Sequence, residues 1–123
     1  MILVDTSIWI DHFRTADNVL IGLLNAGMVL GHPFVVGELA LGNLRQREVV
    51  LSNLADLPRA TVATDAEVLH FINRFALSGS GVGYVDVHLL AAVRLTTGAT
   101  LWTNDKRLHA AAIELNLAAA LSR

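Results

Sequence analysis

MILVDTSIWIDHFR, residues 1–14, contains the pattern that decides the fold class of this chain. The aliphatic run 2–4 is typical of a short buried strand. Asp5 follows this run directly, and residues 6–14 bring large apolar side chains such as Trp9 onto one side of a predicted helix. The stretch therefore predicts a strand, a carboxylate at the strand's carboxyl end and a helix, which is the repeating unit of an α/β fold.

The same alternation is predicted along the rest of the chain. Further strands are expected at 28–30, 60–63, 100–102 and 117–121. Further helices are expected after the caps Asp17 and Thr64, and at 33–43, 45–57, 84–97 and 106–116. Strands separated by helices form a parallel sheet that is covered on both faces. We therefore predict an α/β protein, a three-layer α/β/α sandwich with a mainly parallel sheet, as one domain over residues 1–123.

Local signals mark several helix ends. Asp17 is a predicted N-cap, and Pro33 is placed to open a helix. Thr64 and Glu67 have the spacing of a capping box. The residues expected to face inward from the helix that this box starts are Val68, Leu69, Ile72 and Phe75.

The composition excludes several kinds of protein. The chain has no cysteine, which excludes disulfides, a thiol nucleophile and a cysteine zinc site. Nine Lys and Arg against eleven Asp and Glu give a net charge of −2, which excludes nucleic-acid binding by bulk positive charge. Apolar residues make up 54 % and charged residues 16 %, which indicates an apolar surface buried in a membrane or in a partner.

The stretch 18–37 tests the membrane alternative, because it has no Asp, Glu, Lys or Arg and is long enough to span a bilayer. Turn residues at 25–27 and 31–33 interrupt it, so we interpret it as a helix, a strand and the start of another helix. Residues 1–5 lack the basic flank of a signal peptide. We expect no membrane span and a cytoplasmic protein with an apolar face buried in a partner.

Four of the eleven acidic residues lie in apolar surroundings: Asp5, Glu38, Asp86 and Asp105. Six others fall at helix starts, in turns or on polar helix faces, and Asp11 is ambiguous. A buried carboxylate usually pairs with a cation or binds a metal, and Lys and Arg are too few nearby to pair with all four. A hard divalent cation satisfies several carboxylates at once. If the strands before Asp5 and Asp105 are neighbours, both carboxylates point into one crevice.

Each of these acids also has a purely structural interpretation. Asp5, Asp86 and Asp105 are placed where each can cap the helix that follows, and Glu38 can be a partly exposed acid on a helix face. Taken one at a time these interpretations remain open. All four holding together is less plausible, because the predicted topology lets one crevice gather all four.

Four segments resemble motifs of one known family. They are MILVDTSIWIDHFR with Asp5, PFVVGEL with Glu38, GVGYVDVHLLAA with Asp86, and LWTNDKRL with Thr103 and Asp105. In this order, over the whole chain, they resemble the VapC-type toxins of the PIN-domain nuclease family. The resemblance implies a five-stranded parallel sheet flanked by helices and Mg²⁺- or Mn²⁺-dependent endonucleolytic cleavage of RNA. It also implies an inhibitory VapB-type antitoxin, a homodimer, and products with 5′-phosphate and 3′-hydroxyl ends.

The resemblance and the placement of the acids give one mechanistic hypothesis. Asp5 and Asp86 are the first choice for direct metal ligands, and Glu38 and Asp105 complete the metal site directly or through water. The metal lowers the pKa of a water that attacks the phosphodiester in line. Glu38 is a candidate to take the proton of that water.

Hydroxyls, cations and apolar side chains provide further candidates. Thr103, and Thr6 or Ser7, are candidates to hold the carboxylates or a phosphate oxygen, or are plain helix caps. The candidate phosphate contacts are Arg14, Arg45, Arg47, Arg94, Lys106 and Arg107. Apolar residues that either form a groove for an apolar antitoxin segment or belong to the core are Val35, Val36, Leu39, Leu44, Val49, Val50 and Leu54.

Other functions account for fewer of these features. A haloacid-dehalogenase phosphatase needs a second Asp two residues after Asp5, where the chain has Ser7. A response-regulator receiver needs an acid pair after the first strand, and a serine hydrolase needs G-x-S-x-G, which the chain lacks. The main alternative is a non-catalytic RNA- or partner-binding module on the same fold. His88 is a candidate to touch substrate, although packing in the core is its simpler role.

Overall fold

A computed structural model describes residues 1–121 and shows an α/β protein built on a parallel sheet. The sheet consists of β1 (Ile2–Val4), β2 (Val29–Leu30) and β3 (Thr100–Trp102), in the order β2-β1-β3. Leu3 of β1 pairs with Leu30 on one side and with Leu101 on the other. Because β1 is the central strand, its apolar side chains Leu3 and Val4 are fully buried.

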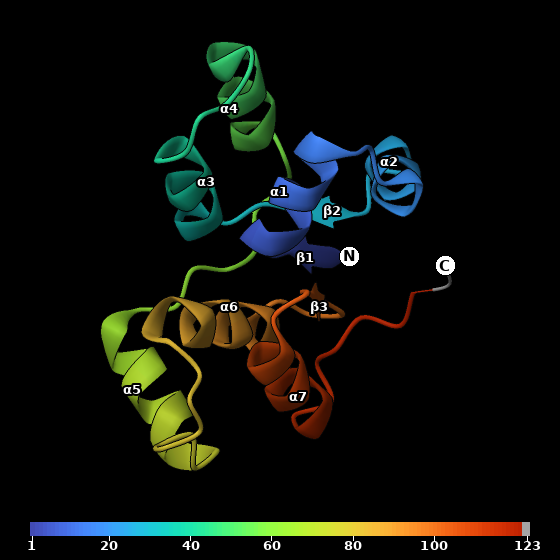
Figure 1. Ribbon diagram of the computed structural model, residues 1–123. Coiled ribbons are helices and arrows are strands. Elements are labelled where there is room, and N and C mark those ends of the chain that lie inside the picture. Colours follow the sequence, from blue (N-terminus) through green and yellow to red (C-terminus); the bar gives the residue numbers. More distant parts are fainter. Residues whose placement is uncertain (122–123) are drawn as a thin grey trace.

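Helices lie on both sides of these strands. They are α1 (Thr6–Arg14), α2 (Asn18–Asn25), α3 (Pro33–Ala40), α4 (Arg47–Ala55), α5 (Asp65–Arg74), α6 (Tyr84–Leu95) and α7 (Lys106–Glu114). Figure 1 shows α1–α4 in the upper half of the view and α5–α7 in the lower half, with the strands between the two groups. Within residues 1–121, no helix is both long and apolar enough to cross a bilayer.

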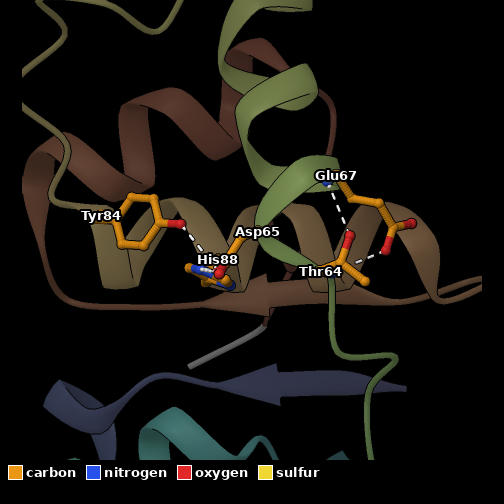
Figure 2. Close-up of polar contacts among 5 residues, drawn as sticks. All are labelled: Thr64, Asp65, Glu67, Tyr84 and His88. Atoms are coloured by element: carbon orange, nitrogen blue, oxygen red, sulfur yellow. Dashed lines mark hydrogen bonds and ion pairs between the residues drawn. The ribbon is translucent and has the colours of Figure 1, made fainter.

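The predicted helix starts are confirmed. The Asp17 carboxylate caps α2 by accepting hydrogen bonds from the backbone N–H groups of Val19 and Leu20. Pro33 occupies the first turn of α3. Thr64 and Glu67 form the capping box of α5, and Figure 2 shows both of its hydrogen bonds.

The expectation of five strands is wrong, because the described residues contain three. The segment 60–63 is irregular, and before it Arg59 makes one isolated bridge to Gly31. The segment 117–121 likewise makes one bridge, from Ala118 to Leu101. Beside β2, pairing is limited because this strand has two residues and Pro33 starts α3 three residues after it ends. The two outer positions of the sheet therefore hold bridges in place of strands.

Some helix boundaries and one core residue also differ from the predictions. α3 ends at Ala40, before the expected residue 43, and the backbone at Gln46 is left-handed (φ 51°), so α4 starts two residues late. α6 and α7 each end two residues earlier than expected. Leu69 was expected inside but is 57 % exposed, because Val68 and Phe71 occupy the buried side of α5.

Candidate active site

Asp5 lies at the carboxyl end of the central strand and is 5 % exposed. It occupies the N-cap position of α1, but its side chain makes no capping hydrogen bond. Its Oδ2 instead accepts hydrogen bonds from Thr103 Oγ1 at 2.7 Å and from Ser7 Oγ at 2.9 Å. The capping interpretation of Asp5 is therefore wrong, and two hydroxyl groups fix the orientation of this buried carboxylate.

Thr103 joins the ends of two neighbouring strands. It is buried just beyond β3, and its hydroxyl donates to Asp5 while accepting a hydrogen bond from the Asp105 backbone N–H at 3.0 Å. The Asp105 side chain caps α7 through one oxygen, because Oδ1 accepts from Leu108 N at 2.9 Å. The capping interpretation is thus correct for Asp105. The Thr103 hydroxyl also links the Asp105 backbone to the Asp5 carboxylate.

Glu38 approaches this region from α3. Its carboxylate is exposed, as the structural interpretation expected, and its Oε1 accepts a hydrogen bond from Thr6 Oγ1 at 2.7 Å. Thr6 is the first residue of α1, directly after Asp5. This bond between residues 32 positions apart in the chain brings Glu38 to the helix that starts at the end of β1.

Asp86 is half-buried in the first turn of α6, whose N-cap is Gly83, so Asp86 is not the cap of that helix. Burial is the largest cause that raises the pKa of Asp86 from its usual 3.8 to about 6. The negative charges that add to this rise belong to Asp5, Asp105 and Glu38, in that order. The four predicted acids are therefore close enough to interact electrostatically.

The donor set fits a hard divalent cation in its chemistry. Within residues 1–121 no Lys or Arg forms an ion pair with any of the four acids. No three His, Cys, Asp or Glu side chains among these residues are arranged to hold a metal ion as they stand. Glu38 and Asp105 are turned toward Thr6 and the start of α7, so joint coordination requires these side chains to rotate. Oxygen donors with uncompensated negative charge are what Mg²⁺ and Mn²⁺ prefer.

Hydroxyl and amide groups complete the hydrogen-bond network. Thr6 and Ser7 hold carboxylates, as expected, since they bond to Glu38 and Asp5. Asn104 was not predicted as part of this network: its N–H donates to Ser7 Oγ and its Nδ2 to Asp11 Oδ2. Asp11, which is ambiguous from sequence alone, thereby ties α1 to the loop after β3. The only sequence signal for Asn104 is its position between Thr103 and Asp105.

A cavity of about 650 Å³ opens next to Glu38, between α1, α3 and the segment leading to α4. Its lining includes Phe13, Arg14, Leu44 and Arg45. The apolar groove predicted along 34–57 is partly wrong, because three of its seven members are core residues: Val35, Leu39 and Leu54. Val36, Leu44 and Val50 are half-buried, and Val49 is exposed.

A family model described as PIN domain matches residues 2–114. The chain belongs to the PIN domain family. Ribonuclease VapC32 of Mycobacterium tuberculosis strain CDC 1551 / Oshkosh is 52 % identical over 120 residues, which cover 98 % of this chain and 97 % of that relative. Ribonuclease VapC32 of strain ATCC 25618 / H37Rv matches equally. No solved structure matches the chain.

The long match makes this a PIN domain of the VapC type. It excludes the phosphatase and receiver alternatives, which belong to other families. In this PIN domain, the strand ends provide Asp5 and Asp105, while α3 and α6 provide Glu38 and Asp86. The acids that stand out from sequence as unexplained charges are therefore Asp86 and the three acids whose charges act on it in the structure.

Proposed function

We propose that this PIN domain is a metal-dependent endoribonuclease and the toxin of a toxin–antitoxin pair. The observation that carries the proposal is the gathering of four carboxylates, in which Thr103 ties Asp5 to the Asp105 backbone and Thr6 holds Glu38 at the start of α1. The charges of Asp5, Asp105 and Glu38 also add to the rise that burial causes in the pKa of Asp86. Such a cluster without Lys or Arg partners is costly unless a cation is bound. The name of the 52 % identical relative, Ribonuclease VapC32, supports RNA as the substrate.

Residues of this chain have distinct roles in the proposed reaction. Asp5 and Asp86 are the direct ligands of Mg²⁺ or Mn²⁺, and Glu38 and Asp105 complete the site. A bound divalent cation neutralises charge that develops on the phosphate and lowers the pKa of water. Thr103 keeps the Asp5 carboxylate oriented through the 2.7 Å hydrogen bond. Preorganised ligands of this kind reduce the side-chain ordering that binding otherwise requires.

Glu38 is the proposed general base, since it is the exposed carboxylate at the edge of the cavity. Its hydrogen bond with Thr6 orients the carboxylate, and a general base must be within hydrogen-bond reach of the proton it takes. Arg14 and Arg45 line the same cavity, so cations are present where an RNA strand approaches Glu38. We also propose a cytoplasmic location, because the proposed RNA substrate is found there.

We place a VapB-type antitoxin in the cavity beside Glu38. Its lining combines exposed apolar side chains, Ile10 and Phe13, with the carboxylate of Glu38. An apolar segment that carries an Arg matches this surface in both polarity and charge. A homodimer is proposed as well, because further large apolar residues remain exposed elsewhere, such as Leu69 and Ile113.

The test uses purified, partner-free protein and total cellular RNA, incubated with Mg²⁺, with Mn²⁺ or with EDTA. We expect discrete fragments with either ion and none with EDTA. Asp5→Asn removes a proposed ligand and is expected to abolish cutting, whereas Asp56→Asn changes an exposed acid at the end of α4 and is expected to cut normally. Equal cutting by Asp5→Asn overturns the assignment, and binding of RNA without cutting by the wild type supports the binding-module alternative.

A further inference from the structure

A column of four rings joins three segments of the chain. His32 and Phe34 have ring centroids 5.2 Å apart, Phe34 and His88 are 4.6 Å apart, and His88 and Tyr84 are 4.7 Å apart. The contact between His88 and Tyr84 is edge-to-face, at 85°, which is a favourable aromatic geometry. The column therefore runs continuously from the end of β2, through α3, to α6.

The central contact of this column lies between the two helices that carry Glu38 and Asp86. Phe34 is one helical turn before Glu38 on α3, and His88 is two residues after Asp86 on α6. α3 packs mainly against α1 and α4, whereas α6 packs mainly against α5 and β3. The ring contact of Phe34 with His88 is thus a direct side-chain link between α3 and α6, which pack mainly against other elements.

His88 is packed between the rings of neighbouring residues. It is 2 % exposed, which makes packing its role and rules out contact with substrate. Neither of its ring nitrogens has a hydrogen-bond partner within residues 1–121. The rings of Phe34 and Tyr84 on either side therefore constrain its position.

The outer end of the column is anchored on α5. Tyr84 Oη lies 3.4 Å from Asp65 Oδ1, and His88 Nε2 lies 3.9 Å from the same oxygen, as Figure 2 shows. Partial burial and the Asp65 carboxylate raise the pKa of Tyr84, so its phenol stays neutral and can donate to Asp65. The capping box of Thr64 fixes the start of α5, and with it the place of Asp65.

We propose that Phe34 and His88 are positioning residues that set the separation of Glu38 and Asp86, and thereby the affinity of the acidic site for its divalent cation. This inference rests on the proposed function. Neither residue touches the cation, and they act by fixing α3 against α6. Residues that orient metal ligands by hydrogen bonds typically contribute roughly 10- to 100-fold to metal affinity, and we expect the lower end of this range for a packing contact.

The test compares two variants that each remove one ring while retaining apolar volume. Phe34→Leu breaks the link between α3 and α6. Phe71→Leu is the matched control, because Phe71 is buried and its ring contacts that of Phe75, at a centroid distance of 4.8 Å, at the other end of α5 from Asp65. Mn²⁺ affinity is measured by electron paramagnetic resonance and Tm by calorimetry, with RNA cleavage as a further readout.

We expect Phe34→Leu to weaken Mn²⁺ affinity about tenfold or more and to lower kcat. Phe71→Leu is expected to lower Tm comparably while retaining the affinity of the wild type. Phe34→Tyr and His88→Phe keep a ring at each position, so both are expected to retain the Mn²⁺ affinity of the wild type. Unchanged Mn²⁺ affinity in Phe34→Leu overturns this inference but leaves the proposed function intact. A wild-type protein that binds no Mn²⁺ and cuts no RNA contradicts the proposed function, and the inference with it.

Discussion

At the scale of single residues, the Thr103 hydroxyl connects two acids, since it donates to Asp5 and accepts from the Asp105 N–H. Thr103→Val keeps the shape and removes both hydrogen bonds. We expect it to lower the free energy of unfolding by about 1–3 kcal/mol, the usual cost of leaving buried polar groups unpaired. Urea titration measures this loss. Thr103→Ser retains the hydroxyl and loses one buried methyl group, so it should lose less stability than Thr103→Val. An equal loss in both variants contradicts the role given to the hydroxyl.

The raised pKa of Asp86 predicts a pH-dependent stability. Its pKa of about 6 exceeds the usual 3.8, so in this range the folded state binds the proton more tightly than the unfolded state. Its contribution to the free energy of unfolding therefore falls as pH rises from about 4 to 6 and is constant above that. Replacing the acid with a neutral amide removes the dependence.

Asp86→Asn is expected to stabilise the metal-free protein at pH 7 by about 1–2 kcal/mol, after allowance for partial solvent exposure. Urea unfolding in EDTA at several pH values measures the difference from wild type. The exposed Asp56→Asn is the control and should be neutral. A difference that does not vary between pH 4 and pH 6 contradicts the electrostatic account of Asp86.

Gly81 and Gly79 form a matched pair in the loop before α6. Both have positive φ, 82° and 76°, so an alanine at either costs about 1–2 kcal/mol of stability. They differ in the room available for a side chain. A Cβ at position 81 would lie 2.9 Å from Arg107 Nη1, whereas a Cβ at position 79 would have no atom within 4 Å. We expect similar Tm losses, but only Gly81→Ala should raise KM for RNA, by displacing Arg107. Equal KM values contradict a role for Arg107 in binding RNA.

At the scale of elements, α3 depends on a histidine cap. His32 Nδ1 accepts a hydrogen bond from Phe34 N, so that nitrogen must be unprotonated. Burial, followed by the charges of His88 and Arg59, lowers the pKa of His32 from 6.5 to about 4. The folded state thus binds the proton more weakly than the unfolded state, and this contribution to stability is lost as pH falls from 6.5 to 4.

His32→Asn keeps an N-cap acceptor without an ionisable ring. We expect its stability, measured by chemical unfolding, to lack the loss that wild type shows between pH 6.5 and 4. Subtracting the free energy of unfolding of the variant from that of wild type at each pH gives the contribution of His32 alone. The opposite contribution of Asp86 is present in both proteins and cancels. Identical pH dependence of the two proteins contradicts the cap described for α3.

The helices were largely predictable because their signals are local. The Asp17 cap, Pro33 at a helix start, and the Thr64 and Glu67 box each act within four residues and all are confirmed. Strands at 60–63 and 117–121 were predicted wrongly, because a strand exists only if a neighbour offers enough paired backbone. β2 has two residues, and the segment near 60–63 makes a single bridge, to Gly31 just after that strand.

At the scale of the whole molecule, the chain brings acids from positions 5, 38, 86 and 105 together. Sequence identifies them because a carboxylate among aliphatic residues has no local explanation. The hydrogen bonds that orient them were less predictable, because Thr6 with Glu38 and Asn104 with Asp11 are distant in sequence. Only the folded sheet and helices place such partners side by side, so the network of the candidate site depends on the tertiary structure.

Divalent-ion binding by the four acids together is the central claim, and a Mn²⁺ titration followed by electron paramagnetic resonance tests it most directly. Wild type is compared with single acid-to-amide variants at the four positions and with Asp56→Asn, an exposed acid outside the set. We predict saturable binding by wild type and Asp56→Asn, and affinities at least about tenfold weaker in each of the four variants. Equal affinity in wild type and all four variants would contradict the account.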